Sequence, residues 1–157
     1  LLEGRSSLLV SLYDRRFKTA EEFISHCPAF CNAISAAPAV IIALRKTGRR
    51  ADANAVLATA EREVDKLESA GDRDFNTEVS GARLATLAGN PKEANRRLRD
   101  AIQRGWKGQD TGFPDPATDP AFTSLKGNAE FQAILRLLHS AQRLEAEKLS
   151  RIDTRGI

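Results

Sequence analysis

Apolar residues recur at intervals of three and four along most of this chain, the spacing that places them on one face of an α-helix. The clearest example lies between residues 51 and 67, where charged residues fill the opposite face. Its apolar positions are Val56, Leu57, Ala60, Val64 and Leu67. No segment predicts a strand. The pattern therefore predicts an all-α protein.

Capping residues, glycines and prolines divide the chain into seven or eight helices. The predicted helices cover about residues 3–14, 20–33, 38–47, 51–70, 75–88, 91–104, 120–125 and 129–149. Thr19 is the expected N-cap of the second helix, which is predicted to bend near Pro28, and Pro38 is expected in the first turn of the third. Leu144 is expected on the apolar stripe of the last helix. Short turns between the helices predict antiparallel hairpins.

Residues 105–120 interrupt this pattern with three glycines and three prolines, which excludes a regular element. The aromatic residues in and beside this loop are Trp106, Phe113 and Phe122. They either line a ligand pocket or anchor the long loop onto the helices. Anchoring is the favoured interpretation, because a loop of this length needs apolar contacts to hold it in place.

Two helical hairpins carry the same set of small and large residues after the turn glycine. Ala53, Leu57 and Ala60 follow Gly48, and Ala94, Leu98 and Ala101 follow Gly89 at the same distances. Small residues let two helices approach closely, and the leucine fills the space between them. This set resembles the second helix of the tetratricopeptide repeat. The two glycines are 41 residues apart, against the 34-residue period of that family. The extra seven residues are expected to lengthen the helix at 50–70.

The resemblance implies a short superhelix of stacked antiparallel hairpins. The first helix of each hairpin departs from the family pattern, which usually has a bulky aromatic residue and a tyrosine there. This chain has Ala37 and Leu44 in the first hairpin, and Glu78 and Ala85 in the second. The segments 101–106, 119–125 and 128–135 resemble the closing part of many bacterial tetratricopeptide proteins. In those proteins the repeats follow a signalling domain, such as a winged-helix domain, a nucleotide cyclase or a kinase. The resemblance therefore implies a regulatory or scaffolding module.

The composition is that of an ordinary globular protein, with 41% hydrophobic and 29% charged residues. The net charge of +3 favours no class of partner. Four arginines cluster on the helix after Pro91: Arg96, Arg97, Arg99 and Arg104. Such a cluster would suit nucleic acid, but the interspersed Glu93 and Asp100 favour a solvated outer face. Nucleic acid is thus the less favoured partner.

Candidate chemistry is sparse. His26, Cys27 and Cys31 are close in sequence, but their spacing does not fit a zinc site and His139 is the only other strong ligand. We expect no metal, no cofactor and no catalytic residue. The chain lacks an apolar run long enough to span a membrane, and its two cysteines suit a reducing compartment, so a cytoplasmic location is expected.

The predicted function is a non-catalytic interaction module that binds a peptide or a partner domain in a helical groove. The residues expected to line this groove are Arg45, Asn76 and Arg83, whose types would suit an acidic or carboxylate group. The alternatives are a small-ligand sensor, with the groove closed by the 106–120 loop, and a nucleic-acid-binding helical domain.

The chain is expected to form one domain over residues 1–150, followed by a frayed tail or linker at 151–157. Because it contains no methionine, we expect it to be a fragment of a larger protein, with a partner domain upstream. A homodimer through the apolar first helix, at Leu8-Leu9-Val10, is a further prediction.

Overall fold

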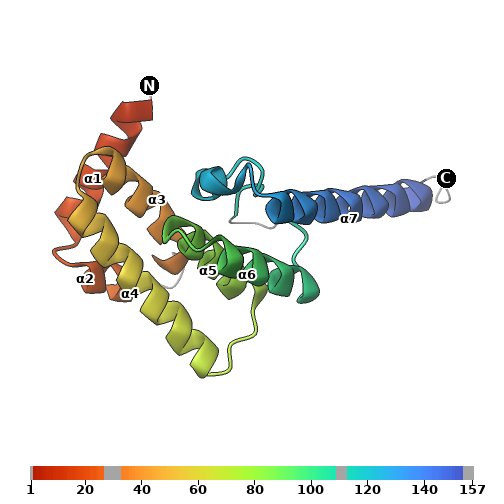
Figure 1. Cartoon of the computed structure of the whole chain (residues 1–157), viewed down its shortest axis with the longest axis horizontal. Helices are drawn as coiled ribbons and strands as arrows, with labels where there is room; N and C mark the ends of the chain where they lie inside the picture. Colours follow the sequence, from red (N-terminus) through yellow and green to blue (C-terminus); the bar gives the residue numbers. More distant parts are fainter. Residues whose placement is uncertain (1, 27–32, 109–112, 154–157) are drawn as a thin grey trace.

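The computed structural model describes residues 2–26, 33–108 and 113–153. This part of the chain is all-α and contains no strand, with neighbouring helices packed antiparallel (Figure 1). The elements in order are α1 (Leu2–Arg16), α2 (Ala20–His26), α3 (Ala33–Lys46), α4 (Arg50–Ser69), α5 (Phe75–Leu87), α6 (Pro91–Gln103), the 3₁₀ helix η1 (Pro120–Leu125) and α7 (Ala129–Asp153). None of the described helices is long and apolar enough to cross a membrane.

Two hairpins, α3–α4 and α5–α6, form the centre of the molecule. Gly48 and Gly89 make their turns at φ values of +81° and +80°, which a residue with a side chain rarely adopts. The six residues that share positions after these glycines are all buried: Ala53, Leu57, Ala60, Ala94, Leu98 and Ala101. Helix α4 has 20 residues and α6 has 13, so the second helix of the first hairpin is the longer one.

Side-chain caps fix several helix starts where the sequence places them. Asp74 accepts a hydrogen bond from the Asn76 amide at the start of α5. Thr19 accepts one from the Glu22 amide at the start of α2, and Asn128 accepts one from the Phe131 amide at the start of α7. Each cap satisfies an amide that has no partner inside its helix.

The start of α3 corrects the sequence prediction. Pro38 lies inside the helix rather than in its first turn, because α3 already begins at Ala33. Proline removes one helical hydrogen bond, but Ile34 and Ala37 before it and Ile41 after it are all buried on one stripe. Burial of this continuous stripe outweighs the lost bond. Helix α2 ends at His26, and the predicted bend at Pro28 falls outside the described residues.

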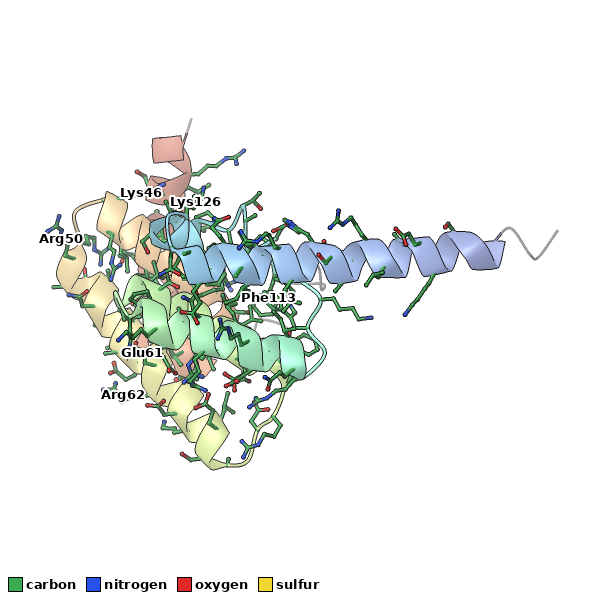
Figure 2. All side chains as sticks on the ribbon, turned by 45° about the vertical axis from the view of Figure 1, so that its right-hand side comes forward. Lys46, Arg50, Glu61, Arg62, Phe113 and Lys126 are labelled. Atoms are coloured by element: carbon green, nitrogen blue, oxygen red, sulfur yellow. The ribbon has the colours of Figure 1, made fainter. Side chains whose placement is uncertain are left out.

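The apolar core has two parts. The first joins α1 to α4, and the second joins α5, α6, η1 and α7 around Trp106, Phe122 and Phe131. Asn95 of α6 donates hydrogen bonds to Asn128 and Glu130, which fixes the start of α7. The second half of α7 extends beyond the other helices (Figures 1 and 2). Leu144 is 58% exposed there, so it does not belong to the buried stripe of α7.

Candidate functional site

Arg83 of α5, which the sequence analysis predicts to line a partner groove, makes contacts within the chain instead. Its guanidinium Nε lies 2.8 Å from Oδ2 of Asp119, and both side chains are buried. Its Nη1 donates to the Ser35 carbonyl at 2.8 Å, and its guanidinium carbon lies 5.7 Å from the centre of the Phe113 ring. Arg83 therefore ties α3, α5 and the segment after 112 together.

Arg45 and Asn76 do not join Arg83 in one site. Arg45 donates from Nη1 to the Leu87 carbonyl at 2.9 Å, where it compensates the negative end of α5. The Asn76 amide group donates to Asp74 at 3.0 Å within the first turn of α5. Each residue makes an intramolecular contact at a different place, and binding of a partner by this set stays a prediction.

The face formed by α3 and α5 is covered by the chain's own residues 113–125. Phe122 is 1% exposed and Asp119 is 1% exposed where this segment contacts α5. Trp106 is also buried, and Phe113 is partly buried between the α5–α6 hairpin and α7 (Figure 2). The three aromatic residues thus anchor the loop, which agrees with the favoured interpretation of their pattern.

The arginine cluster of α6 is neutralised by carboxylates. Arg96 pairs with Glu93 at 2.6 Å and with Asp100 at 2.5 Å. Arg99 pairs with Glu130 at 3.1 Å, and Arg104 pairs with the buried Glu78 at 2.7 Å. A surface that binds nucleic acid needs cations free to meet phosphates, and these are engaged within the chain.

Arg97 is the buried member of this cluster and connects three helices. Its guanidinium pairs with Glu68 of α4, with Glu78 of α5 at 3.2 Å and with Glu93 of its own helix at 2.7 Å. It lies directly over Gly81, where an added Cβ would come within 2.8 Å of Nη1. Glycine in the middle of α5 is explained by this close approach.

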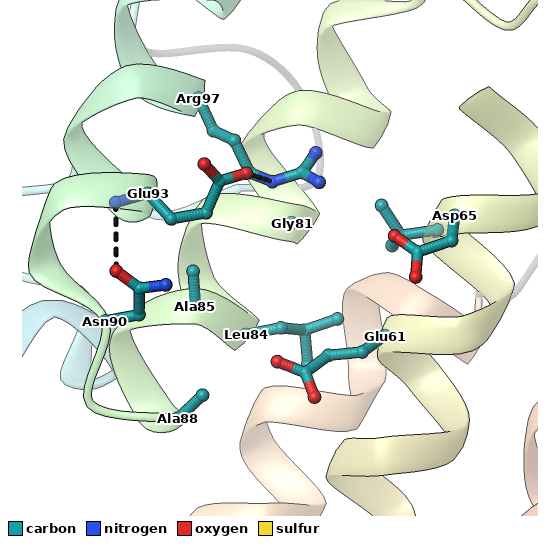
Figure 3. Close-up of a pocket in the computed structure, with 10 residues that line it drawn as sticks. Glu61, Asp65, Gly81, Leu84, Ala85, Ala88, Asn90, Glu93 and Arg97 are labelled. Carbon is teal, nitrogen blue, oxygen red and sulfur yellow. Dashed lines mark hydrogen bonds and ion pairs between the residues drawn. The ribbon is translucent and has the colours of Figure 1, made fainter. Parts of the chain in front are cut away.

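A cleft of about 270 Å³ opens beside Arg97, between α4, α5 and α6. We call it the acidic cleft. Its floor is apolar and consists of Val64, Gly81, Leu84, Ala85 and Ala88. Its polar rim consists of Glu61 and Asp65 from α4 and of Asn90, Glu93 and Arg97 from α6 and the turn before it. Figure 3 shows the two α4 carboxylates facing this group across α5.

The carboxylates of the cleft differ in their electrostatic environment. Glu93 accepts two hydrogen bonds from Arg96, which lower its pKa. Burial raises the pKa of Glu61, and the negative charge of Asp65 adds to this effect. Among the described side chains, none forms a hydrogen bond or an ion pair with Glu61 or Asp65. The charge of Arg97, which is paired with Glu68, Glu78 and Glu93, partly offsets the rise in the pKa of Glu61. The cleft therefore presents two carboxylates that form no direct ion pair among the described residues.

Sequence reasoning placed Glu61 and Asp65 on the solvated face of their helix and missed the cleft. Their spacing of four residues shows that they share one face of α4. The missing information is the position of α6, which brings Glu93 and Arg97 opposite them. A signal was present in Gly81, since a glycine within an otherwise regular helix often marks a close approach.

No cluster of three metal-ligating side chains occurs within residues 2–26, 33–108 and 113–153. Cys27 and Cys31 lie outside these ranges. His26, on α2, is exposed and close to Ser25 and Glu22. His139 lies on α7, and its Nε2 is 3.9 Å from Oδ2 of Asp115 in the loop before η1. The two histidines therefore occupy different elements.

The chain matches no protein-family model, no curated protein and no solved structure. Its function must accordingly be inferred from the chemistry of its surfaces.

Proposed function

We propose that this chain is a non-catalytic interaction module that holds a cationic side chain of a protein partner in the acidic cleft. The observation that carries this proposal is the pair of carboxylates, Glu61 and Asp65, which line the cleft and form no ion pair among the described residues, while Arg97 beside them is already paired with three other carboxylates. A lysine or arginine has the matching shape, with an apolar stem and a charged end. Its stem would lie against Ala85 and Ala88, the more accessible apolar residues of the lining, while its charge meets the two carboxylates.

The helical hairpins support this type of function. They share a turn glycine, a small–large–small set of buried residues and antiparallel packing. We propose that they form a short tetratricopeptide-like array, whose stacked helices offer grooves to extended or helical peptides. The partner segment belongs either to another protein or to another domain of the same protein.

The expected partner is thus cationic, whereas Arg45, Asn76 and Arg83 would suit an anionic one. Arg83 and Arg45 already donate to carbonyl or carboxylate groups of the chain. A small-ligand sensor gains no support from the α3–α5 face, because Asp119 and Phe122 are packed against it. Nucleic acid gains no support from α6, whose four clustered arginines are all paired.

A peptide-display selection on the immobilised chain tests the proposal. We expect recovered peptides to be enriched in lysine or arginine over aspartate and glutamate. The variant Glu61→Gln/Asp65→Asn should bind such a peptide about tenfold more weakly, since one charge-assisted contact contributes about 1.5 kcal/mol. The control is Glu63→Gln, which removes a carboxylate from the same helix outside the cleft. Recovery of mainly acidic peptides would overturn the proposal.

The affinity for a cationic peptide should also depend on pH. Glu61 attracts a cation only when it is ionised, and burial raises its pKa above the usual glutamate range. We therefore expect the affinity to fall as the pH is lowered through this raised pKa, at a higher pH than an ordinary glutamate would require. Isothermal titration at several pH values measures this effect. The Glu61→Gln variant should show a flatter profile, and identical profiles would exclude Glu61 from the site.

A further inference from the structure

Helix α1 presents an apolar strip on the side that faces away from the core. Leu8 is 62% exposed and Leu12 is 48% exposed, and they lie one helical turn apart. The opposite side of the helix packs inward through Val10 and Tyr13. Isolated exposed leucines are common in proteins, but two neighbours on one helical face form a continuous surface.

Arginines flank this strip at both ends. Arg5 precedes Leu8 by three residues, and Arg15 and Arg16 follow Leu12 by three and four, so all share one face of α1. All three arginines are exposed, and none forms an ion pair with a described carboxylate. Asp14, an acidic residue of α1 whose side chain the structure describes, is engaged by Arg49 at 2.6 Å. This arrangement contrasts with α6, where each clustered arginine has a carboxylate.

We infer that the outer face of α1 docks an acidic amphipathic helix of a protein partner. The complementary helix would carry two apolar side chains one turn apart, with acidic residues one turn beyond each of them. Its apolar residues would cover Leu8 and Leu12, and its carboxylates would meet the three arginines. The surface spans about 16 Å of helix, given 1.5 Å per residue from Arg5 to Arg16.

Two other occupants, a second copy of α1 and a membrane surface, fit the outer face of α1 less well. In an antiparallel pair of α1 helices from two copies, Arg5 of one copy would face Arg15 and Arg16 of the other. Such like-charge contacts disfavour the homodimer expected from the sequence. A helix that lies on a membrane needs a broad apolar face, whereas the exposed large apolar residues of α1 are these two leucines alone among its described side chains.

The experiment uses the whole chain and a labelled helical peptide of about 20 residues, with two leucines one turn apart flanked by glutamates. A matched peptide carries lysines in place of the glutamates. Fluorescence anisotropy is measured on the Glu61→Gln/Asp65→Asn variant, in which the acidic cleft no longer attracts a lysine side chain, and it should show binding of the glutamate peptide only. Leu8→Ala/Leu12→Ala should weaken it at least about tenfold. The control Leu137→Ala removes an equally exposed leucine from α7 and should have no effect.

Charge reversal provides the decisive variant. Added to Glu61→Gln/Asp65→Asn, the change Arg5→Glu/Arg15→Glu/Arg16→Glu should abolish binding of the glutamate peptide and create binding of the lysine peptide. The glutamate peptide should bind the unmodified chain as tightly as it binds Glu61→Gln/Asp65→Asn, since the acidic cleft is a separate site. The inference is overturned if the Glu61→Gln/Asp65→Asn variant binds neither peptide or both equally. It is also overturned if anionic phosphatidylserine vesicles bind while the peptide does not, or if sedimentation shows a dimer that Leu8→Ala/Leu12→Ala dissociates.

Discussion

Replacing Arg83 with alanine is expected to lower the free energy of unfolding by about 3–5 kcal/mol. The substitution would leave the carboxylate of Asp119, which is 1% exposed, as a buried charge without its partner. The Ser35 carbonyl would lose a hydrogen-bond donor at the same time. Urea denaturation followed by circular dichroism measures the change.

The matched control is Arg62→Ala, which breaks an exposed ion pair with Glu21 and should cost less than about 1 kcal/mol. If Arg83 stabilises the fold through Asp119, the double variant with Asp119→Ala should cost less than the sum of the single variants. A loss below about 1 kcal/mol in Arg83→Ala would contradict the structural role, and would return Arg83 to the set of residues available for a partner.

The second large effect is expected at Gly81. A Cβ there would lie 2.8–3.0 Å from three atoms of the Arg97 side chain, so the guanidinium must move away from Glu68 and Glu78. Alanine favours helix formation by up to about 1 kcal/mol, but the displaced ion pairs outweigh this gain. We expect Gly81→Ala to destabilise the protein by about 2 kcal/mol in the same urea measurement.

Ser80→Ala is the control at the neighbouring position. Ser80 is fully buried, and its hydroxyl has no hydrogen-bond partner in the described part of the chain, so alanine should be neutral or slightly stabilising. A stabilising effect of Gly81→Ala comparable to that of Ser80→Ala would show that helix propensity dominates and that Arg97 relocates without cost.

The hairpins were predictable because their signals are local. Gly48 and Gly89 mark the turns, and caps such as Thr19 and Asn128 lie within three residues of the amides that they satisfy. Periodicity identified the buried faces of α4 and α6 for the same reason. These features depend on a few consecutive residues, and no tertiary contact competes with them.

Two features of the fold differ from what capping residues and periodicity predicted. Pro38 was expected at a helix start, but burial of the residues on both sides of it extends α3 toward the N-terminus. Leu144 was expected on the apolar stripe of α7, but it follows Leu138 by six residues, about 240° around the helix, and its side chain is 58% exposed. The start of α3 thus depends on tertiary burial, which periodicity does not contain, whereas the spacing before Leu144 already places it off the stripe.

The candidate site could not be predicted from the sequence, because contacts between residues far apart in the chain create it. The pairing of Arg83 with Asp119 joins residues 36 positions apart, and the acidic cleft combines residues of α4 with residues of α6. Side-chain type alone suggested that Arg83 was available to a ligand and that Glu61 was merely solvated. The long-range contacts show instead that Arg83 is already paired within the chain and that Glu61 lines a cleft.

The most direct test of the acidic cleft is a titration of the isotope-labelled chain with N-acetyl-arginine amide, followed by NMR. We predict saturable shifts confined to residues around Glu61, Asp65 and Leu84, with a dissociation constant on the order of 1 mM for so small a ligand. N-acetyl-aspartate amide should produce none. The shifts should disappear in Glu61→Gln/Asp65→Asn. Saturable binding of the aspartate compound, or arginine-induced shifts that persist in that variant, would contradict the proposed site.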